Sequence, residues 1–512
     1  MSAPAPVLPP RFQRNVVSVY LNIVVSALIL LVMTPVLVGG LGKAGYGLWV
    51  LLTSLAPYAT LLDFGLGSAT VKYVGEYYRR DSELTGRTIS TTLSTLTLVG
   101  AVVLAAGIPF SLFFPSLFHV QHGQDAAAVV GMLLFTVSSA ISLPASAFES
   151  TLMGAQRYDV TNLTVLVVLA AKGIAWGVII ATGGSIVELA VATVVLETAG
   201  HFILFFVVRR LPDVTFRFPS FDRRLAGRLV RLSAWIALGE ASTFVIRQID
   251  PVIVGAVVSV PAAGVYAVGQ RLSVGVDLLI RPMMTGLLPH ASHLSTREDP
   301  ALLRATMLAG TRITLAVAGP ICLTVVLLAG PAIHLWVGSG FGSARNVAVF
   351  LSTAIAVAAV TRPGVLMMQG IGRARTVVRL VAVEAVLNLV LSVWLGRTIG
   401  LEGVALATLI ASTVGRFGLL VPCVCRSFGV PIREFVGSLV RAHVPPIAAT
   451  LAVGWLIGRT DLLEIPALIA AGIALTVTYV ATFVVTGLKA DERRRLAAMG
   501  RRWGTSALAR IS

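Results

Sequence analysis

Apolar segments long enough to cross a membrane follow one another almost without interruption from Val16 to Leu488. A helix needs about 20 consecutive apolar residues to cross the hydrocarbon core of a bilayer. The segments lack the alternation of barrel strands, so helices would satisfy the backbone in lipid. We therefore expect about fourteen membrane-spanning helices. Their predicted ranges are 15–38, 45–70, 88–114, 126–150, 160–182, 186–208, 229–256, 261–289, 305–330, 346–369, 376–396, 402–425, 442–459 and 464–488.

The composition agrees with membrane-spanning segments. Hydrophobic residues make up 56% of the chain, charged residues make up 12%, and the mean hydropathy is +0.89. A soluble domain has about 25% charged residues. The sequence thus predicts an all-α integral membrane protein.

Positive charge is distributed unevenly over the connections between the predicted spans. The chain holds 40 lysine and arginine residues and a formal net charge of +17. If the N-terminus is cytoplasmic, about 30 of them lie in connections on that side, as the positive-inside rule requires. The opposite connections hold Lys43, Arg345, Arg397 and Arg459. We therefore expect both termini in the cytoplasm and an even number of spans.

The largest basic cluster extends from Arg209 to Arg231. In a soluble protein such a cluster would suggest nucleic acid, but beside a span it is more simply a cytoplasmic retention signal that contacts anionic lipid. We expect membrane lipids, and not nucleic acid, as partners of this segment.

No residue pattern predicts a metal or a cofactor. The three cysteines fall in or at the ends of spans, where cysteine behaves as a small apolar residue. His119, His122 and Asp125 share one outer loop, and a solvated loop explains them better than a metal site does.

An internal repeat is visible at an offset of 216 residues. At this offset Pro35 falls on Pro251, Gly39 falls on Gly255, and "GAQR" at 154–157 falls on "GIGR" at 370–373. A shared offset over several spans indicates two copies of one six-span unit. Because six is even, the copies have the same orientation, so a pseudo-two-fold axis along the membrane normal would relate them, as in parallel-repeat transporters.

The repeat predicts the domain organisation. The two six-helix halves are followed by two additional spans and a basic tail. The predicted ranges are 1–208 for the N-terminal half, 209–231 for a basic cytoplasmic connection, 232–425 for the C-terminal half, 426–488 for the two additional spans and 489–512 for the cytoplasmic tail.

The repeated prolines lie near the outer end of the leading span of each half. A proline frees a backbone carbonyl and nearby glycines relax the backbone, which permits a bend. Pro35, Gly39, Pro251 and Gly255 are therefore hinge candidates. The alternative is that each helix simply ends there.

Residues 34–76, "TPVLVGGLGKAGYGLWVLLTSLAPYATLLDFGLGSATVKYVGE", resemble the opening of bacterial polysaccharide or O-antigen flippases. These belong to the multidrug, oligosaccharidyl-lipid and polysaccharide exporter superfamily, and the resemblance extends over essentially the whole chain. It implies transport of undecaprenyl-diphosphate-linked sugar units from the inner to the outer leaflet of the bacterial cytoplasmic membrane, without an enzymatic step. The implied partners are the lipid-linked sugar and other polysaccharide assembly proteins.

Six basic residues lie inside predicted spans, where an ionisable side chain needs a partner or a water-filled cavity. An arginine there suits a lipid diphosphate, because its guanidinium binds phosphate oxygens bidentately. The candidate substrate-binding residues are Arg271, Arg247, Arg281, Lys172, Arg362 and Arg416. Arg271, near the middle of its span, is the best single candidate.

Ion pairing is the alternative explanation for these cations. Arg247 lies near Asp250, and Asp277 precedes Arg281 by one turn. Lys172, Arg271, Arg362 and Arg416 have no carboxylate within one turn, so their partners would come from other helices. The candidate coupling or ion-pair residues are Glu240, Asp277, Glu197 and Glu384.

Two other functions stay open from the residues alone. One is a cation-coupled multidrug exporter of the same superfamily. The other is a membrane glycosyltransferase or polymerase, which would need carboxylates on a sizeable outer loop. The longest outer connections, 115–125 and 331–345, contain only Asp125 between them, which disfavours the enzyme.

Overall fold

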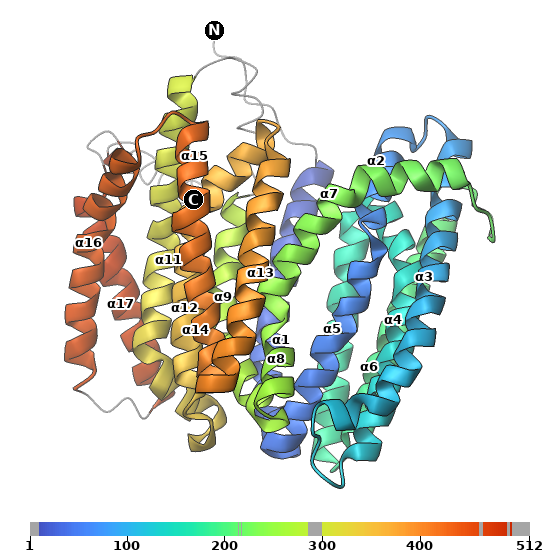
Figure 1. Ribbon diagram of the computed structural model, residues 1–512, viewed down its shortest axis with the longest axis horizontal. Coiled ribbons are helices and arrows are strands. Elements are labelled where there is room, and N and C mark those ends of the chain that lie inside the picture. The colour runs from blue at the N-terminus through green and yellow to red at the C-terminus, as the bar shows by residue number, and fades with distance from the viewer. Residues whose placement is uncertain are drawn as a thin grey trace, which may run out of the picture. The chain divides into compact units, whose positions relative to one another are not determined.

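The computed structural model describes residues 10–212, 214–216, 218–284, 300–459, 464–488 and 492–493. All regular elements within these ranges are helices (Figure 1). The α-helices are α1 (Pro10–Leu55), α2 (Leu66–Tyr77), α3 (Ser82–Leu117), α4 (Asp125–Gly154), α5 (Tyr158–Ala181), α6 (Ile186–Arg209), α7 (Arg223–Gln248), α8 (Asp250–Val257), α9 (Val260–Met284), α11 (Pro300–Val337), α12 (Ala344–Gly370), α13 (Ala374–Ile399), α14 (Leu401–Thr413), α15 (Val421–Ser427), α16 (Ile432–Ile457) and α17 (Ile465–Thr486). The others are the 3-10 helices η1 (Ala56–Asp63) and η2 (Ser339–Phe341) and the π-helix η3 (Val414–Leu420).

By length and composition, 11 helices of the described ranges can cross a membrane, or up to 12 if the bent pair within α7 is one span. The all-α membrane fold class is therefore confirmed, whereas the count of fourteen is not. Two features contribute to the difference. Helix α1 runs through two predicted spans and is broken at Gly42, where φ is 67°. Helix α9, predicted as a span, contains three charged residues and is not among the 11.

Side-chain caps explain where several helices begin. The carboxylate of Asp81 accepts the backbone N–H of Leu84 at 2.8 Å, which caps α3. The carboxylate of Asp222 accepts the N–H groups of Arg224 and Leu225, and these hydrogen bonds lower the pKa of Asp222. Each cap satisfies backbone donors that have no partner inside the helix.

The chain forms two compact units. The first comprises Met1–Arg271 with Val378–Ala411, and the second comprises Leu272–Val377 with Ser412–Ser512. The predicted domain boundaries remain a prediction, because these units are defined by packing and not by repeat or topology.

In the first unit α4 packs against α3 and α6, while α5 packs against α1 and α6 (Figure 1). One apolar core of this unit includes Leu66, Ile89, Leu96, Leu143 and Leu152, each almost fully buried. These residues place α2, α3 and α4 around one core.

In the second unit α11 packs against α12, α16 and α17. Leu328 of α11 joins Ala471 and Leu475 of α17 in one apolar cluster. Arg312 of α11 forms an ion pair with Glu492 at 2.6 Å, so the segment after α17 is tied to α11 as well.

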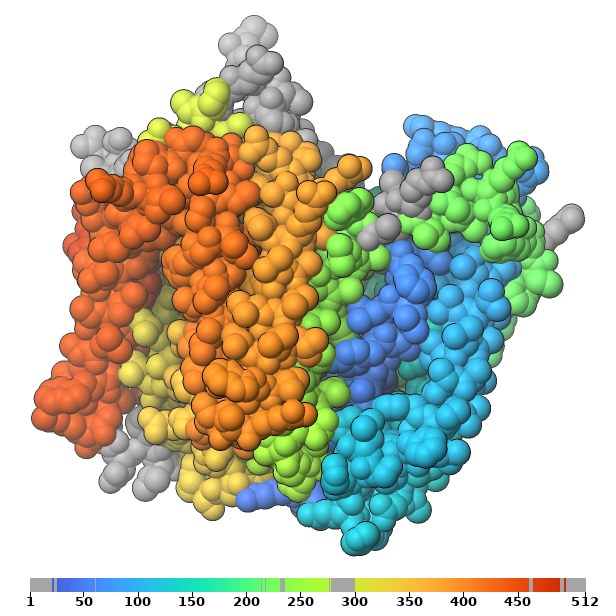
Figure 2. All heavy atoms as spheres, viewed as in Figure 1, coloured from blue at the N-terminus to red at the C-terminus, as the bar shows by residue number. Residues whose placement is uncertain are grey.

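Large apolar side chains lie on the outside of helices from both units. Leu98, Leu112 and Phe113 of α3 are each at least 60% exposed, and Trp455 of α16 is 61% exposed. Figure 2 shows the outer surfaces of α3, in light blue, and α16, in orange-red. Such faces are suited to lipid.

The α4–α5 and α12–α13 turns lie 216 residues apart and share one geometry. The N–H of Arg157 donates to the carbonyl of Leu152 at 2.8 Å, and the N–H of Arg373 donates to that of Met368 at 2.8 Å. The preceding residues, Gln156 and Gly372, have φ of 59° and 83°. This helix ending is a Schellman-type cap. Its recurrence supports the repeat detected in the sequence.

Candidate transport site: buried charges in the helices

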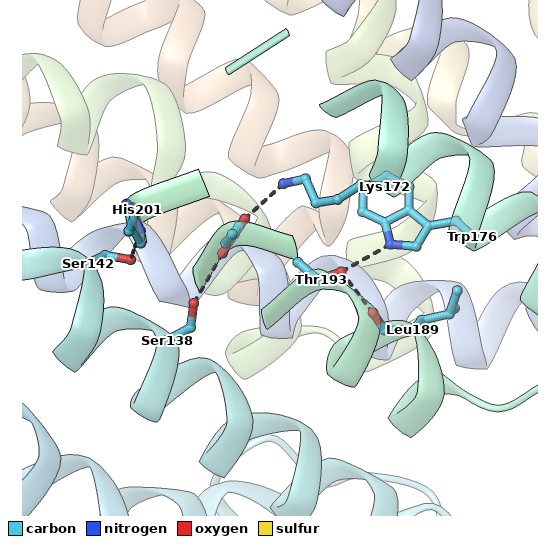
Figure 3. A network of polar contacts seen from close by, with 8 residues as sticks. Ser138, Ser142, Lys172, Trp176, Leu189, Thr193 and His201 are labelled. Atoms are coloured by element: carbon cyan, nitrogen blue, oxygen red, sulfur yellow. Dashed lines mark hydrogen bonds and ion pairs between the residues drawn. The ribbon is translucent and has the colours of Figure 1, made fainter. Parts of the chain in front are cut away.

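Glu197 of α6 is the centre of a polar network in the first unit. One carboxylate oxygen accepts from Lys172 Nζ of α5 at 2.8 Å, and the other accepts from Ser138 Oγ of α4 at 3.1 Å. Figure 3 shows Lys172 and Ser138 reaching this carboxylate from opposite sides. The carboxylate thus joins three helices, and Lys172 has an ion-pair partner that lies on another helix.

Trp176 extends this network toward the end of α5. The Lys172 ammonium lies 5.8 Å from the Trp176 ring centroid. The indole Nε1 of Trp176 donates to Thr193 Oγ1 at 3.0 Å, and that hydroxyl donates to the carbonyl of Leu189 (Figure 3). The ring is buried, so the lysine is held by a carboxylate and an aromatic face together.

A second network surrounds Asp250, the first residue of α8. Its Oδ2 accepts from Tyr266 Oη at 2.6 Å and from Thr408 Oγ1 at 3.0 Å. Thr408 in turn accepts from Asn388 Nδ2 at 2.8 Å. All four residues are buried.

Two oxygens of the Asp250 network, Asp250 Oδ1 and Asn388 Oδ1, have no hydrogen-bond partner among the described residues. A buried carboxylate is costly unless it is protonated or faces a cation. The arrangement of carboxylate, amide and hydroxyl oxygens can therefore hold a proton or a small cation. Sequence spacing placed Asp250 next to Arg247 and missed Tyr266, Asn388 and Thr408, which are far away in the chain.

Asp277 and Arg362 form an ion pair in the second unit. Arg362 Nη2 of α12 donates to Asp277 Oδ1 of α9 at 2.5 Å, and the Asp277 side chain is 7% exposed. The sequence suggested Arg281, one turn away, as the partner of Asp277. The side chain of Arg281 lies outside the described residues.

Arg416 lies in the π-helical segment η3, between α14 and α15. Its Nη1 donates to Thr361 Oγ1 at 3.3 Å, and Thr361 is the neighbour of Arg362 in α12. Short π-helical segments are frequent at functional sites, because the extra residue re-aims the side chains that follow. Two of the six candidate cations therefore converge on the same part of α12.

Arg271 is half-buried and is the twelfth of the 25 residues of α9. It makes no hydrogen bond or ion pair with the other residues that the structure describes. Glu197, one of its candidate partners, is paired with Lys172 instead. The neighbouring Gln270 donates from Nε2 to the carbonyl of Arg247 at 3.1 Å, which joins α9 to α7.

The remaining acidic candidates lie on separate helices. Glu240 of α7 lies near Ser68 of α2. Glu384 of α13 is 1% exposed and lies one turn before Asn388. Glu384 is therefore four residues before Asn388, a member of the Asp250 network. No described hydrogen bond joins Glu240 to this network.

The hinge candidates differ in their surroundings. A Cβ at Gly39 would have no heavy atom within 4 Å, whereas a Cβ at Gly255 would lie 2.4 Å from the Leu51 side chain. Pro35 lies inside α1, and Pro251 is in the first turn of α8. Close packing on α1 is therefore a structural reason for Gly255, while bending at Pro35 and Gly39 stays a prediction.

The long apolar helices and the few charged residues among them are those of a multi-pass membrane protein, and comparison with known proteins gives the family. The profile of the family described as "Polysaccharide biosynthesis protein" matches residues 12–295. The chain belongs to this family, which confirms the predicted resemblance to polysaccharide flippases.

Relatives and solved structures cover most of the chain. The "Uncharacterized membrane protein EpsK" of Bacillus subtilis (strain 168) is 22% identical over 504 residues, which is 95% of this chain and 96% of the relative. The lipid II flippase MurJ in an inward closed conformation has a TM-score of 0.69 at 16% identity, covering 91% of this chain and 98% of its own. An inward-facing MATE family transporter of the MOP superfamily also has a TM-score of 0.69 at 16% identity, covering 79% of this chain and 94% of its own.

The solved structures show that the chain has the same fold as a MOP superfamily transporter. The two solved structures are those of a flippase and of a multidrug resistance transporter. At 16% identity the solved structures show the fold alone, and both a flippase and a multidrug transporter adopt it. The substrate therefore has to be argued from the residues.

Proposed function

We propose that this protein flips an undecaprenyl-diphosphate-linked oligosaccharide from the inner to the outer leaflet of the bacterial cytoplasmic membrane. Both termini would face the cytoplasm. The description of the family supports a role in polysaccharide biosynthesis, and the fold is suited to alternating access. Lipid-linked sugar, membrane lipids and other polysaccharide assembly proteins would be the partners.

The observation that carries this proposal is the position of Arg271. Helix α9 is 25 residues long, or about 37 Å at 1.5 Å per residue, and Arg271 lies near its middle. If α9 crosses the membrane, as the sequence predicts, Arg271 lies near the centre of the bilayer. A charge at the centre of a bilayer costs about 2.5–3.5 kcal/mol on insertion scales, so it needs an anion or water. Without an ion pair to a described carboxylate, Arg271 is suited to bind an anionic substrate group.

A diphosphate fits the chemistry of the site. A guanidinium stays charged when it is desolvated and binds phosphate oxygens through two parallel hydrogen bonds. Arg362 has a similar capacity: its Nη2 donates to Asp277, while its buried Nη1 has no hydrogen-bond partner among the described residues.

Replacement of Arg271 tests the proposal. Arg271→Ala should reduce flipping of a fluorescent lipid-linked sugar in proteoliposomes by at least about tenfold, because hydrogen bonds to charged groups contribute about 1.5–3 kcal/mol. Thermal stability should stay near wild type. Arg271→Lys should rescue transport only in part, because the charge remains and the bidentate geometry is lost.

The control is Arg345→Ala, which removes an arginine of the predicted outer surface and should leave flipping unchanged. If Arg271 instead forms an ion pair with Glu384, the alanine variant should fold poorly, and Arg271→Ala with Glu384→Gln should restore stability. A stable and fully active Arg271→Ala protein would contradict both explanations.

A multidrug exporter is the second candidate, because MATE family transporters share the fold. Such a transporter carries lipophilic cations, for which a cavity with arginines is poorly suited. Transport of cationic dyes by the reconstituted protein, without flipping of the lipid-linked sugar, would favour this candidate over the flippase.

A further inference from the structure

A cavity of about 480 Å³ lies in the first unit, on the side of the helices that the charge distribution assigns to the cytoplasm. Three connections form it: the α2–α3 turn, the α4–α5 turn and the segment after α6. Its main lining residues are Tyr78, Arg79, Gln156, Arg157, Leu211 and Pro212. None of these residues is a candidate for the transport site.

Two arginines from different connections face this cavity. The Arg157 side chain is 40% exposed, and only its Nε contacts a described carboxylate, that of Asp159 at 3.4 Å. The Arg79 guanidinium carbon lies 5.5 Å from the Tyr78 ring centroid. The α2–α3 turn also contains Asp81, whose carboxylate caps α3. The cavity is therefore basic on two sides.

In the second copy of the repeat, the arginine that corresponds to Arg157 has a side-chain acceptor. Arg373, 216 residues after Arg157, donates from Nη1 to Ser427 Oγ at 2.8 Å. The position that corresponds to Ser427 in the first copy is Leu211, which lines the cavity. An apolar side chain there cannot accept a hydrogen bond, so the guanidinium of Arg157 keeps its Nη donors for another acceptor.

The backbone of the cavity is strained at two non-glycine residues. Arg79 has φ of 66° and Gln156 has φ of 59°. Residues other than glycine rarely adopt this left-handed backbone conformation, and those that do are concentrated at functional sites. The corresponding position in the second copy is Gly372, which adopts the same conformation without strain. The first copy therefore has a glutamine at a position where glycine would be less strained.

We infer that this cavity binds a phosphate group, held between Arg79 and Arg157. Guanidinium groups are the side chains best suited to phosphate oxygens. The cavity is larger than a phosphate ion, and Tyr78, Leu211 and Pro212 offer apolar surface to the rest of the ligand. The ligand is therefore a phosphate ester, either the headgroup of an anionic lipid or a soluble phosphorylated molecule. This site is independent of the proposed transport substrate.

The first experiment measures thermal unfolding of the full-length protein in detergent during a titration with inorganic phosphate or pyrophosphate at constant ionic strength. The wild type should show saturable stabilisation. Arg157→Gln and Arg79→Gln should each weaken binding about tenfold. Arg373→Gln is the matched control, because that guanidinium is already bonded to Ser427, and it should bind as the wild type does.

A third variant is designed to bind phosphate more tightly than the wild type, which misfolding could not cause. Asp159→Asn removes the carboxylate that competes for Arg157, so it should tighten phosphate binding about threefold. Size-exclusion chromatography of each variant checks that it is folded.

The second experiment identifies the source of the phosphate. Nanodiscs of phosphatidylcholine with or without phosphatidylglycerol are compared by thermal unfolding and by native mass spectrometry of retained lipid. Retention of phosphatidylglycerol that is lost in Arg157→Gln supports a lipid headgroup. Stabilisation by the soluble anions alone, lost in the same variant, supports a soluble ester. The inference is overturned if neither probe stabilises the wild type saturably, or if Arg373→Gln weakens binding as much as Arg157→Gln.

Discussion

Charged side chains inside the helices are held by partners that lie far away in the sequence. Lys172 and Glu197 are 25 residues apart, and Asp277 and Arg362 are 85 residues apart. Spacing within one helix turn therefore identified the charged residues but did not predict these two pairs. The hydrogen bond from Arg362 to Asp277 joins two helices. The pairing of Asp277 with Arg281, whose side chain lies outside the described residues, stays a prediction. The packing of the helices decides which helices are neighbours, and a single sequence does not show this packing.

Asp250 is the residue whose role can be tested most directly at this scale. Asp250→Asn keeps the shape of the side chain and an oxygen that can accept from Tyr266 and Thr408, so the protein should fold. Because the negative charge is lost, the network should no longer bind or release a cation, and transport should fall at least about tenfold. Flipping in proteoliposomes and thermal unfolding measure the two effects.

The control for Asp250 is Asp125→Asn, which removes a carboxylate from the first turn of α4 and should leave transport unchanged. Wild-type flipping by the Asp250→Asn protein would show that the buried network is only structural.

Helix existence was easier to predict than helix shape. The range 88–114 predicted α3, which spans Ser82–Leu117 because Asp81 caps it about two turns earlier. The range 402–425 predicted one span, and Leu401–Ser427 can cross the membrane as one span. Within this span the chain divides into α14, the π-helix η3 and α15, which the range did not predict. Hydropathy measures how apolar a segment is, and it does not show whether the backbone hydrogen bonds follow an α-helical or a π-helical pattern. The π-helix around Arg416 therefore could not be predicted from the apolar residues.

Helices α1 and α9 approach each other so closely that only glycine fits. A Cβ at Gly47 would lie 2.1 Å from the carbonyl oxygen of Val260, and a Cβ at Gly264 would lie 3.0 Å from the Cα of Gly47. Small residues at such crossings let the backbones of membrane helices touch. This contact fixes the start of α9, the helix that positions Arg271.

Gly47→Ala should therefore destabilise the protein by about 1–3 kcal/mol, the usual cost of overpacking. The measurement is the midpoint of thermal unfolding of the purified protein. Gly177→Ala in α5 is the matched control, because a Cβ there meets no heavy atom within 4 Å. The control should be as stable as the wild type or slightly more stable, since alanine favours a helix. Equal stability of Gly47→Ala would contradict the close contact.

At the scale of the whole molecule, the predicted orientation in the membrane depends on the distribution of basic residues. The internal repeat provides an independent check of this orientation. Two copies of an even number of spans have the same orientation, so corresponding turns of the two copies face the same side. The α4–α5 and α12–α13 turns correspond, and both carry arginine, at Arg157 and Arg373. This agrees with the positive-inside rule, under which both turns are cytoplasmic. In this predicted orientation the phosphate cavity would lie on the cytoplasmic side.

Cysteine labelling tests this orientation. Ser185 and Ser339 are exposed and lie in turns expected outside, whereas Ser82 and Ser220 are exposed and lie in connections expected in the cytoplasm. Single cysteines at these positions, in a protein whose three native cysteines have been replaced, are treated in intact cells with a membrane-impermeant thiol reagent. Only Ser185→Cys and Ser339→Cys should react, because a charged reagent does not cross the bilayer. All four should react after permeabilisation, which controls for accessibility.

The opposite result would be reaction of only the Ser82→Cys and Ser220→Cys proteins in intact cells. The predicted orientation would then be reversed, and the phosphate cavity would face outward. Cytoplasmic phosphate esters and inner-leaflet lipids could not reach it there.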